Sequence, residues 1–142
     1  MNKKLKGYTQ NSLRERVAGA DPYQLIQMLM TGALDNLNYA KGAIERKDFE
    51  KKGQHISKAS NIIESLRTSL NSDLGGEVSD NLDQLYLYMN ETLADVSRNN
   101  DLEKLTEVHS LLSQIKSSWD AIPMSAREEA ESQSVQVSAV GA

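Results

Sequence analysis

The chain has 142 residues, a length typical of one domain, with no cysteine, 39% apolar residues and a formal net charge of −4 at pH 7. The lack of cysteine excludes disulfides, zinc–thiolate sites and a cysteine nucleophile. The acidic balance argues against nucleic acid as a partner, because a polyanion needs a basic surface. The sequence has no apolar run of membrane-spanning length and no apolar signal core, so we expect a cytoplasmic protein without stable membrane insertion.

The first helix is expected to begin directly after a polar stretch, residues 1–20. Asp21 is suited to the N-cap position, Pro22 to the first helical position and Gln24 to the third. The helical period of apolar residues then continues to about Arg46. We expect residues 1–20 to form a mobile N-terminal segment.

Three later stretches carry the same helical period, at about 48–70, 77–98 and 100–121. Between the first two of them, the turn residues of 71–76 ("NSDLGG") predict a loop. Asn100 is the expected N-cap of the last helix, with Glu103 at its third position.

These elements predict an all-α fold, an antiparallel up-down four-helix bundle over residues 21–122. The four helices have similar lengths of roughly 32–38 Å, and short links force neighbouring helices to fold back on each other. Residues 123–142 are rich in Ser, Glu, Gln, Ala and Val without a period, so we expect a disordered tail.

Two of the expected helices have a single apolar stripe, which is what a bundle core requires. In helix 48–70 the stripe is Phe49, Ile56, Ala59, Ile63, Leu66 and Leu70. In helix 100–121 it is broader and comprises Leu105, Val108, Leu111, Leu112, Ile115 and Trp119.

The other two helices carry more apolar surface than a core stripe needs. The first has a core stripe of Ile26, Met30, Ala33, Leu37, Ala40 and Ile44, and beside it a second stripe of Leu25, Met28, Leu29, Tyr39 and Ala43, with Gly32 between them. In helix 77–98 the expected core stripe is Val78, Leu82, Leu85, Met89, Leu93 and Val96, while Tyr86, Leu87 and Tyr88 point elsewhere. The two stripes of the first helix cover roughly 240° of its circumference, against about 100° for a core face.

This excess admits two interpretations. The N-terminal segment could shield part of it, and surface Leu and Tyr are common. Alternatively, the excess forms an apolar groove for an amphipathic helix of a partner, which Gly32 would allow to approach closely. We expect these groove or rim residues on the bundle: Leu25, Met28, Leu29, Gly32, Tyr39, Tyr86, Leu87 and Tyr88. A structural or adaptor bundle that dimerises through the same surface is the alternative.

Catalytic and metal-binding patterns are not found in the sequence. A histidine phosphotransfer domain needs a basic residue and a Gly one turn after its His, but His109 is followed there by Leu112 and Ser113. A di-iron bundle needs Glu three residues before His, which neither His55 nor His109 has. We therefore expect no enzyme, no catalytic or metal site and no cofactor.

The sequence resembles the flagellar secretion chaperones (FliS) over about residues 8–120. The resembling residues are Tyr8, Val17, "ADPYQLIQMLMTGAL" (20–34), "IIESLRTSL" (62–70), "GGEVSDNLDQLYLYM" (75–89) and "NDLEKLTEVHSLLSQIKSSW" (100–119). Their order and spacing together are more specific than any one piece. One departure is that Met30 and Thr31 stand where members of the family commonly have an aromatic and an acidic residue.

The resemblance implies a protein that binds the disordered C-terminal segment of flagellin, prevents its premature polymerisation and delivers it to the flagellar type III export gate. It implies that the flagellin segment becomes helical as it wraps the bundle. It also suggests the hypothesis that the N-terminal segment, with Tyr8, lies over the groove when the groove is empty; the alternative is a plain disordered leader. An empty groove would make self-association possible.

Overall fold

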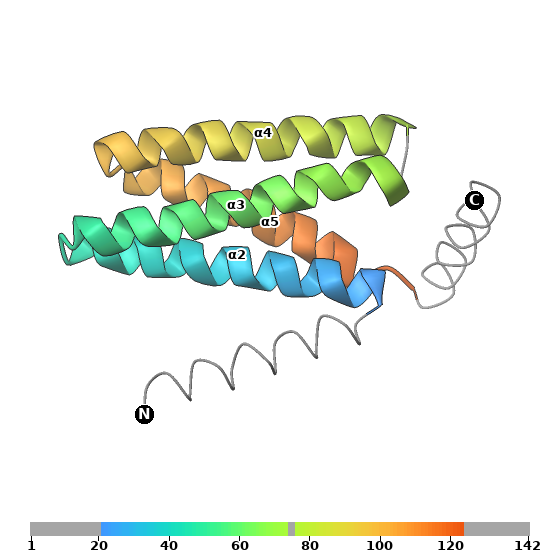
Figure 1. The fold of residues 1–142 in the computed structure, drawn as a ribbon, viewed down its shortest axis with the longest axis horizontal. Coiled ribbons are helices and arrows are strands. Elements are labelled where there is room, and N and C mark those ends of the chain that lie inside the picture. The colour runs from blue at the N-terminus through green and yellow to red at the C-terminus, as the bar shows by residue number, and fades with distance from the viewer. Residues whose placement is uncertain (1–20, 74–75, 124–142) are drawn as a thin grey trace, which may run out of the picture.

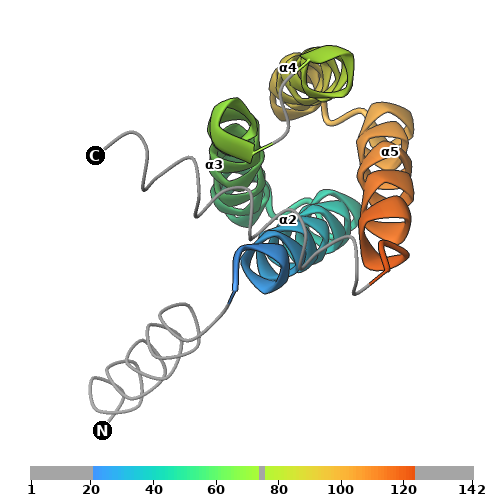
Figure 2. The ribbon, with the colours of Figure 1, turned by 90° about the vertical axis from the view of Figure 1, so that its right-hand side faces the viewer.

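The computed structural model describes residues 21–73 and 76–123, which form four long α-helices. They are α2 (Pro22–Glu45), α3 (Phe49–Asp73), α4 (Gly76–Asn99) and α5 (Leu102–Asp120). The helices run alternately up and down (Figure 1), and the end-on view places them at the corners of a square (Figure 2). Each helix packs on its chain neighbours, and α5 packs on α2. This confirms the predicted four-helix bundle.

Parts of the sequence prediction lie outside the described residues, namely the N-terminal segment 1–20 and the tail from residue 124 onward. The boundaries assigned to those segments stay predictions. Within the described helices, no stretch is both long and apolar enough to cross a membrane.

The start of α2 is as predicted. Asp21 is the N-cap, and its Oδ1 accepts a hydrogen bond of 2.7 Å from the backbone N–H of Gln24. Pro22 occupies the first turn, where a missing N–H has no cost.

The predicted loop over 71–76 is too long. α3 continues to Asp73 and α4 begins at Gly76. Each Asn, Ser or Asp in a helix interior costs about 0.5–0.7 kcal/mol of helix stability relative to Ala. The packing of a long helix can therefore override the turn preference of these residues.

The predicted cap of the last helix is wrong by one residue. The N-cap of α5 is Asp101, whose Oδ1 accepts from the N–H of Lys104 at 3.2 Å. Asn100 instead has a φ of 56°, a left-handed conformation that Asn tolerates. Its side chain is engaged elsewhere, because its Oδ1 accepts a 2.6 Å hydrogen bond from Nζ of Lys52.

Lys52 is a buried lysine that ties α3 to the end of α4. Besides Asn100, its Nζ donates to the backbone carbonyl of Ser97 at 2.8 Å. A positive charge is favourable there because the last carbonyls of a helix carry partial negative charge. The ring of Phe49 lies 5.2 Å from the ammonium. Phe49 is 47% exposed and lies beside the Lys52 ammonium, which corrects its predicted place in the core.

The core otherwise follows the predicted stripes of α2, α3 and α5. Small residues on the facing sides of α2 and α3, including Ala33, Ala40 and Ala59, are fully buried and let this pair pack most closely. Leu111, Ile115 and Trp119 of α5 are half-buried and pack against the core from one side.

The core stripe of α4 differs from the prediction in its N-terminal half. Val78 is 61% exposed and Leu85 is also exposed, whereas Ser79 and Tyr86 are buried. The observed stripe is Ser79, Leu82, Tyr86, Met89, Leu93 and Val96, with strict spacing of three and four residues. Ser79 is tolerated inside because its hydroxyl donates to the carbonyl of Leu70 at 3.2 Å.

Replacing Lys52 by Met should lower the free energy of unfolding by about 1.5–3 kcal/mol, because two charge-assisted hydrogen bonds to the end of α4 are lost. Urea unfolding followed by circular dichroism measures this. The matched control is Lys51→Met, which removes the same charge from an exposed position of the same helix. Equal losses in the two variants would show that the buried contacts of Lys52 do not matter.

Candidate functional site: an apolar groove between α4 and α5

An apolar groove of about 450 Å³ lies between the N-terminal half of α4 and the C-terminal half of α5. Its lining is Val78, Leu82, Leu85, Leu111, Gln114, Ile115, Ser118, Trp119 and Ile122. Most of these side chains are apolar and partly open to solvent. Surface of this kind favours an apolar partner over a polar ligand.

The groove is open because α4 and α5 pack less extensively than any other pair of neighbouring helices. Toward the other end of these helices, polar contacts bridge them. The hydroxyl of Tyr88 donates to the carboxylate of Glu107, and Lys104 and Asp95 form an ion pair of 3.3 Å. The hydrogen bond to Glu107 raises the pKa of the Tyr88 hydroxyl. These bridges close the groove at one end, so it opens where α4 begins and α5 ends.

The C-terminal end of α5 is held on α2 by two aromatic residues. The rings of Tyr23 and Trp119 stack with centroids 5.4 Å apart. The Tyr23 hydroxyl donates to the carbonyl of Trp119 at 2.9 Å, and the Trp119 indole N–H donates to the carbonyl of Tyr23 at 3.1 Å. Because a stacked ring and two reciprocal hydrogen bonds fix its orientation, Trp119 forms a rigid wall of the groove.

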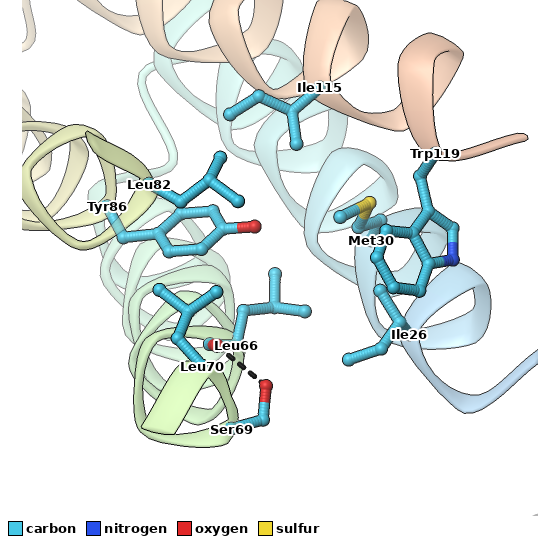
Figure 3. A pocket seen from close by; sticks show the side chains of 9 residues that line it. All are labelled: Ile26, Met30, Leu66, Ser69, Leu70, Leu82, Tyr86, Ile115 and Trp119. Atoms are coloured by element: carbon cyan, nitrogen blue, oxygen red, sulfur yellow. Dashed lines mark hydrogen bonds between the residues drawn. The ribbon is translucent and has the colours of Figure 1, made fainter. Parts of the chain in front are cut away.

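Behind this wall lies a smaller cavity of about 40 Å³ inside the bundle. Leu82, Ile115 and Trp119 line both the cavity and the groove. Figure 3 shows Tyr86 reaching from α4 toward Met30 and Trp119 across the cavity, with Leu66 and Leu70 of α3 beside its ring. Burial raises the pKa of Tyr86 to about 12.

The structure separates the three α4 residues that the sequence grouped together. Tyr86 is only 2% exposed and fills the core, so its predicted position on the groove or its rim is wrong. The physical reason is the strict spacing of the α4 stripe, which turns residue 86 inward. Leu87 is 37% exposed and Tyr88 is also exposed. Neither lines the groove, although Tyr88 lies at its closed end.

The predicted residues of α2 carry less free apolar surface than expected. Leu25 and Met28 are half-buried, and Leu29 packs against the core. A Cβ added to Gly32 would make an ordinary contact of 3.5 Å with the side chain of Ile62, so Gly32 faces α3 and the packing of α2 on α3 does not require a glycine here. Tyr39 is 57% exposed and lies against His55 of α3. Tyr8 lies outside the described residues.

Sequence reasoning missed the groove itself. Val78, Leu85 and Leu111 were placed in the core, and Ile122 was given no role. The signal was present in the spacing, because residues 78 and 85 break the alternation of three and four that residues 79 and 86 keep. A Ser and a Tyr at those alternating positions looked less apolar than a Val and a Leu.

Within the ranges 21–73 and 76–123, no three His, Asp or Glu side chains come together in a way that could hold a metal ion. The fold and the groove thus define a four-helix bundle with an exposed apolar surface as its main surface feature. The family model "Flagellar protein FliS" matches residues 4–126 of the chain.

Relatives of known function agree with the family match. The chain is 46% identical over 120 residues to the flagellar secretion chaperone FliSB of Pseudomonas aeruginosa, covering 84% of this chain and 95% of that protein. It is 40% identical to FliS of Salmonella typhimurium, covering 83% of this chain and 88% of that protein. For FliS of Vibrio cholerae the identity is 37%, with 87% and 90% covered. The chain belongs to the FliS family of flagellar secretion chaperones.

Replacing Tyr86 by Ala should destabilise the bundle by about 3–5 kcal/mol, because it opens a large cavity in the core. Tyr88→Ala removes the same side chain from an exposed neighbour and should cost less than about 1 kcal/mol. Urea unfolding compares the two. Should Tyr86→Ala fail to fold, Tyr86→Phe keeps the ring and should match or exceed the stability of the unchanged chain. Equal costs at 86 and 88 would contradict the observed orientation of α4.

Proposed function

We propose that the protein binds the disordered C-terminal segment of flagellin in the α4–α5 groove and keeps it from polymerising before export. Family membership supports a role in flagellar secretion. The observation that carries the proposal is the groove, where apolar side chains of two helices remain open after the bundle has folded.

The dimensions of the groove favour a short amphipathic helix as the bound form. From Val78 to Leu85 the groove follows α4 for about 10 Å, at a rise of 1.5 Å per residue. That length accommodates about two helical turns, which present apolar anchors at spacings of i, i+3 or i+4, and i+7. The rigid Trp119 wall and the open side at Val78 suit anchors of this kind.

Energetics require contacts beyond the groove. Ordering one residue of a disordered segment costs about 1–2 kcal/mol. At about 25 cal/mol per Å², each ordered residue must bury roughly 40–80 Å² of apolar surface to compensate. A long segment therefore needs more surface than the groove offers. The exposed side chains of Leu87 and Tyr88 on α4 and of Tyr39 on α2 are the proposed extension, with half-buried Leu25, Met28 and Leu29.

Two finer steps belong to the same proposal. The N-terminal segment, including Tyr8, covers the groove until flagellin displaces it, so deleting residues 1–17 should raise the affinity for flagellin or promote self-association. No change in either would refute this.

The loaded chaperone then docks on the flagellar export gate. If the cytoplasmic domain of an export-gate protein does not retain the chaperone–flagellin complex, that step is refuted.

The direct test compares two aspartate substitutions on α4. Leu85→Asp places a charge in the groove and should weaken binding of a flagellin C-terminal peptide at least tenfold, because the carboxylate must be desolvated. Leu87→Asp carries the same change on a side chain of similar exposure outside the groove lining, and should have a smaller effect. Fluorescence anisotropy of the labelled peptide measures the affinity, and circular dichroism confirms that both variants fold.

The opposite ranking, with Leu87→Asp the more damaging, would place the peptide on the outer face of α4. If neither substitution matters and the isolated chain sediments as a tight dimer that flagellin does not dissociate, the adaptor alternative is favoured instead.

A further inference from the structure

A second surface, on the outer side of α2 and α3, is aromatic and positively charged. Tyr39 and His55 are in ring contact across the two helices, with centroids 5.1 Å apart. Lys51, His55 and Lys58 lie at spacings of four and three residues, so they share one face of α3. We call the surface formed by Tyr39, Arg46, Lys51, His55 and Lys58 the α2–α3 basic face.

His55 is held in one tautomer by its neighbour on α2. The side-chain amide of Asn36 donates to the carbonyl of Gly32 at 2.9 Å, which leaves its Oδ1 as the acceptor. That oxygen lies 3.0 Å from Nδ1 of His55, so Nδ1 carries the proton and Nε2 holds the free lone pair. Burial, followed by the charges of Lys58, Lys51 and Arg46, lowers the pKa of His55 below its ordinary value of 6.5.

The cations of this region lack counter-ions, in contrast to those elsewhere. Across the described part of the chain, every Lys or Arg outside residues 41–58 forms an ion pair, namely Arg67, Arg98, Lys104 and Lys116. Within 41–58 stand six basic and three acidic residues. None of these six forms an ion pair with another described residue, and only Lys52 is otherwise bound, to Ser97 and Asn100.

This asymmetry is the argument for a partner. The chain has a net charge of −4, so acidic residues outnumber basic ones overall. Residues 41–58 nevertheless carry an excess of three positive charges. If ion pairing were unrelated to position, paired and unpaired cations would be mixed along the chain. Here the unpaired ones gather around an exposed Tyr and a His whose charged form they disfavour.

We propose that the α2–α3 basic face is a docking surface for a carboxylate-rich segment of a second protein. Its carboxylates would neutralise Arg46, Lys51 and Lys58, while Tyr39 and His55 supply the apolar contact. Nucleic acid and anionic membrane are poorer occupants, because the acidic remainder of the chain repels an extended polyanion or a charged plane. A short acidic segment touches only the basic face.

The face lies away from the α4–α5 groove. The groove opens where α4 begins and α5 ends, whereas Lys51 and His55 belong to the first turns of α3, near the opposite end of the bundle (Figure 1). A segment confined to the groove therefore leaves the basic face free, and one that extends to Tyr39 reaches only the aromatic edge of that face and none of its cations. The proposal does not depend on what occupies the groove.

Binding at this face should strengthen as the pH falls. In the free protein Lys58, Lys51 and Arg46 disfavour the imidazolium of His55. A carboxylate of the segment that accepts a hydrogen bond from Nε2–H favours the imidazolium and outweighs the added burial, so docking raises the pKa of His55 and the complex takes up a proton. Affinity should therefore increase between about pH 7.5 and pH 5.5, while Glu carboxylates stay ionised.

The test titrates the full chain with a short poly-L-glutamate peptide at low ionic strength, followed by NMR of the His55 imidazole and by calorimetry. The variant Arg46→Gln/Lys51→Gln/Lys58→Gln should bind at least tenfold more weakly. The matched control Arg98→Gln/Lys104→Gln/Lys116→Gln removes the same net charge from ion-paired positions and should bind nearly as well as the unchanged chain. Circular dichroism establishes that both fold, since exposed ion pairs contribute little stability.

Two further variants separate the contributions. His55→Gln should keep most of the affinity but lose its pH dependence, and Leu85→Asp in the groove should leave polyglutamate binding unchanged. Equal weakening in the two triple variants would reduce the effect to overall charge and overturn the proposal. So would the absence of measurable binding, or tighter binding to anionic phospholipid vesicles or RNA than to polyglutamate.

Discussion

The inward position of Tyr86 is the constraint on which the groove depends. Because this large ring fills the core of the bundle, the neighbouring positions 78 and 85 cannot also face inward, and Val78 and Leu85 remain outside. Facing them, α5 presents Leu111, Ile115 and Trp119 from its own edge. An apolar surface thus remains after folding because Ser79 and Tyr86, and not Val78 and Leu85, occupy the inward positions of α4.

The ends of the bundle are fastened by specific polar contacts. At one end, Lys52 reaches from α3 to the last carbonyls of α4 and to Asn100. At the other, Tyr23 and Trp119 lock the start of α2 to the end of α5. Between these fixed points Tyr88–Glu107 and Lys104–Asp95 join α4 to α5 in addition to the shared apolar core, and the groove lies beyond them. A chaperone with rigid ends and one loosely packed pair of helices can offer a partner an apolar surface without unfolding.

The sequence was sufficient for the fold and insufficient for the site. Periodicity and the Asp21-Pro22 start predicted the four helices, because caps and apolar stripes are local features. The predicted excess of apolar surface on α4 is present, because several of its large apolar side chains are exposed. Its position was wrong by one residue, because a pattern of Val and Leu seemed a better core than Ser79 and Tyr86. That choice depends on the Ser79–Leu70 hydrogen bond and on the cavity that receives the Tyr86 ring, both of which are tertiary. Likewise, whether a lysine forms an ion pair depends on the side chains of the neighbouring helix, whose position the sequence alone does not give.

The most direct measurement is an NMR structure determination of contacts in the complex, with methyl groups of Val, Leu and Ile labelled in the bundle and an unlabelled flagellin C-terminal segment. The account predicts intermolecular nuclear Overhauser effects from the segment to the methyl groups of Val78, Leu85 and Ile115. Contacts confined to α2 or to Leu87, with the methyl resonances of the groove unchanged on binding, would contradict it.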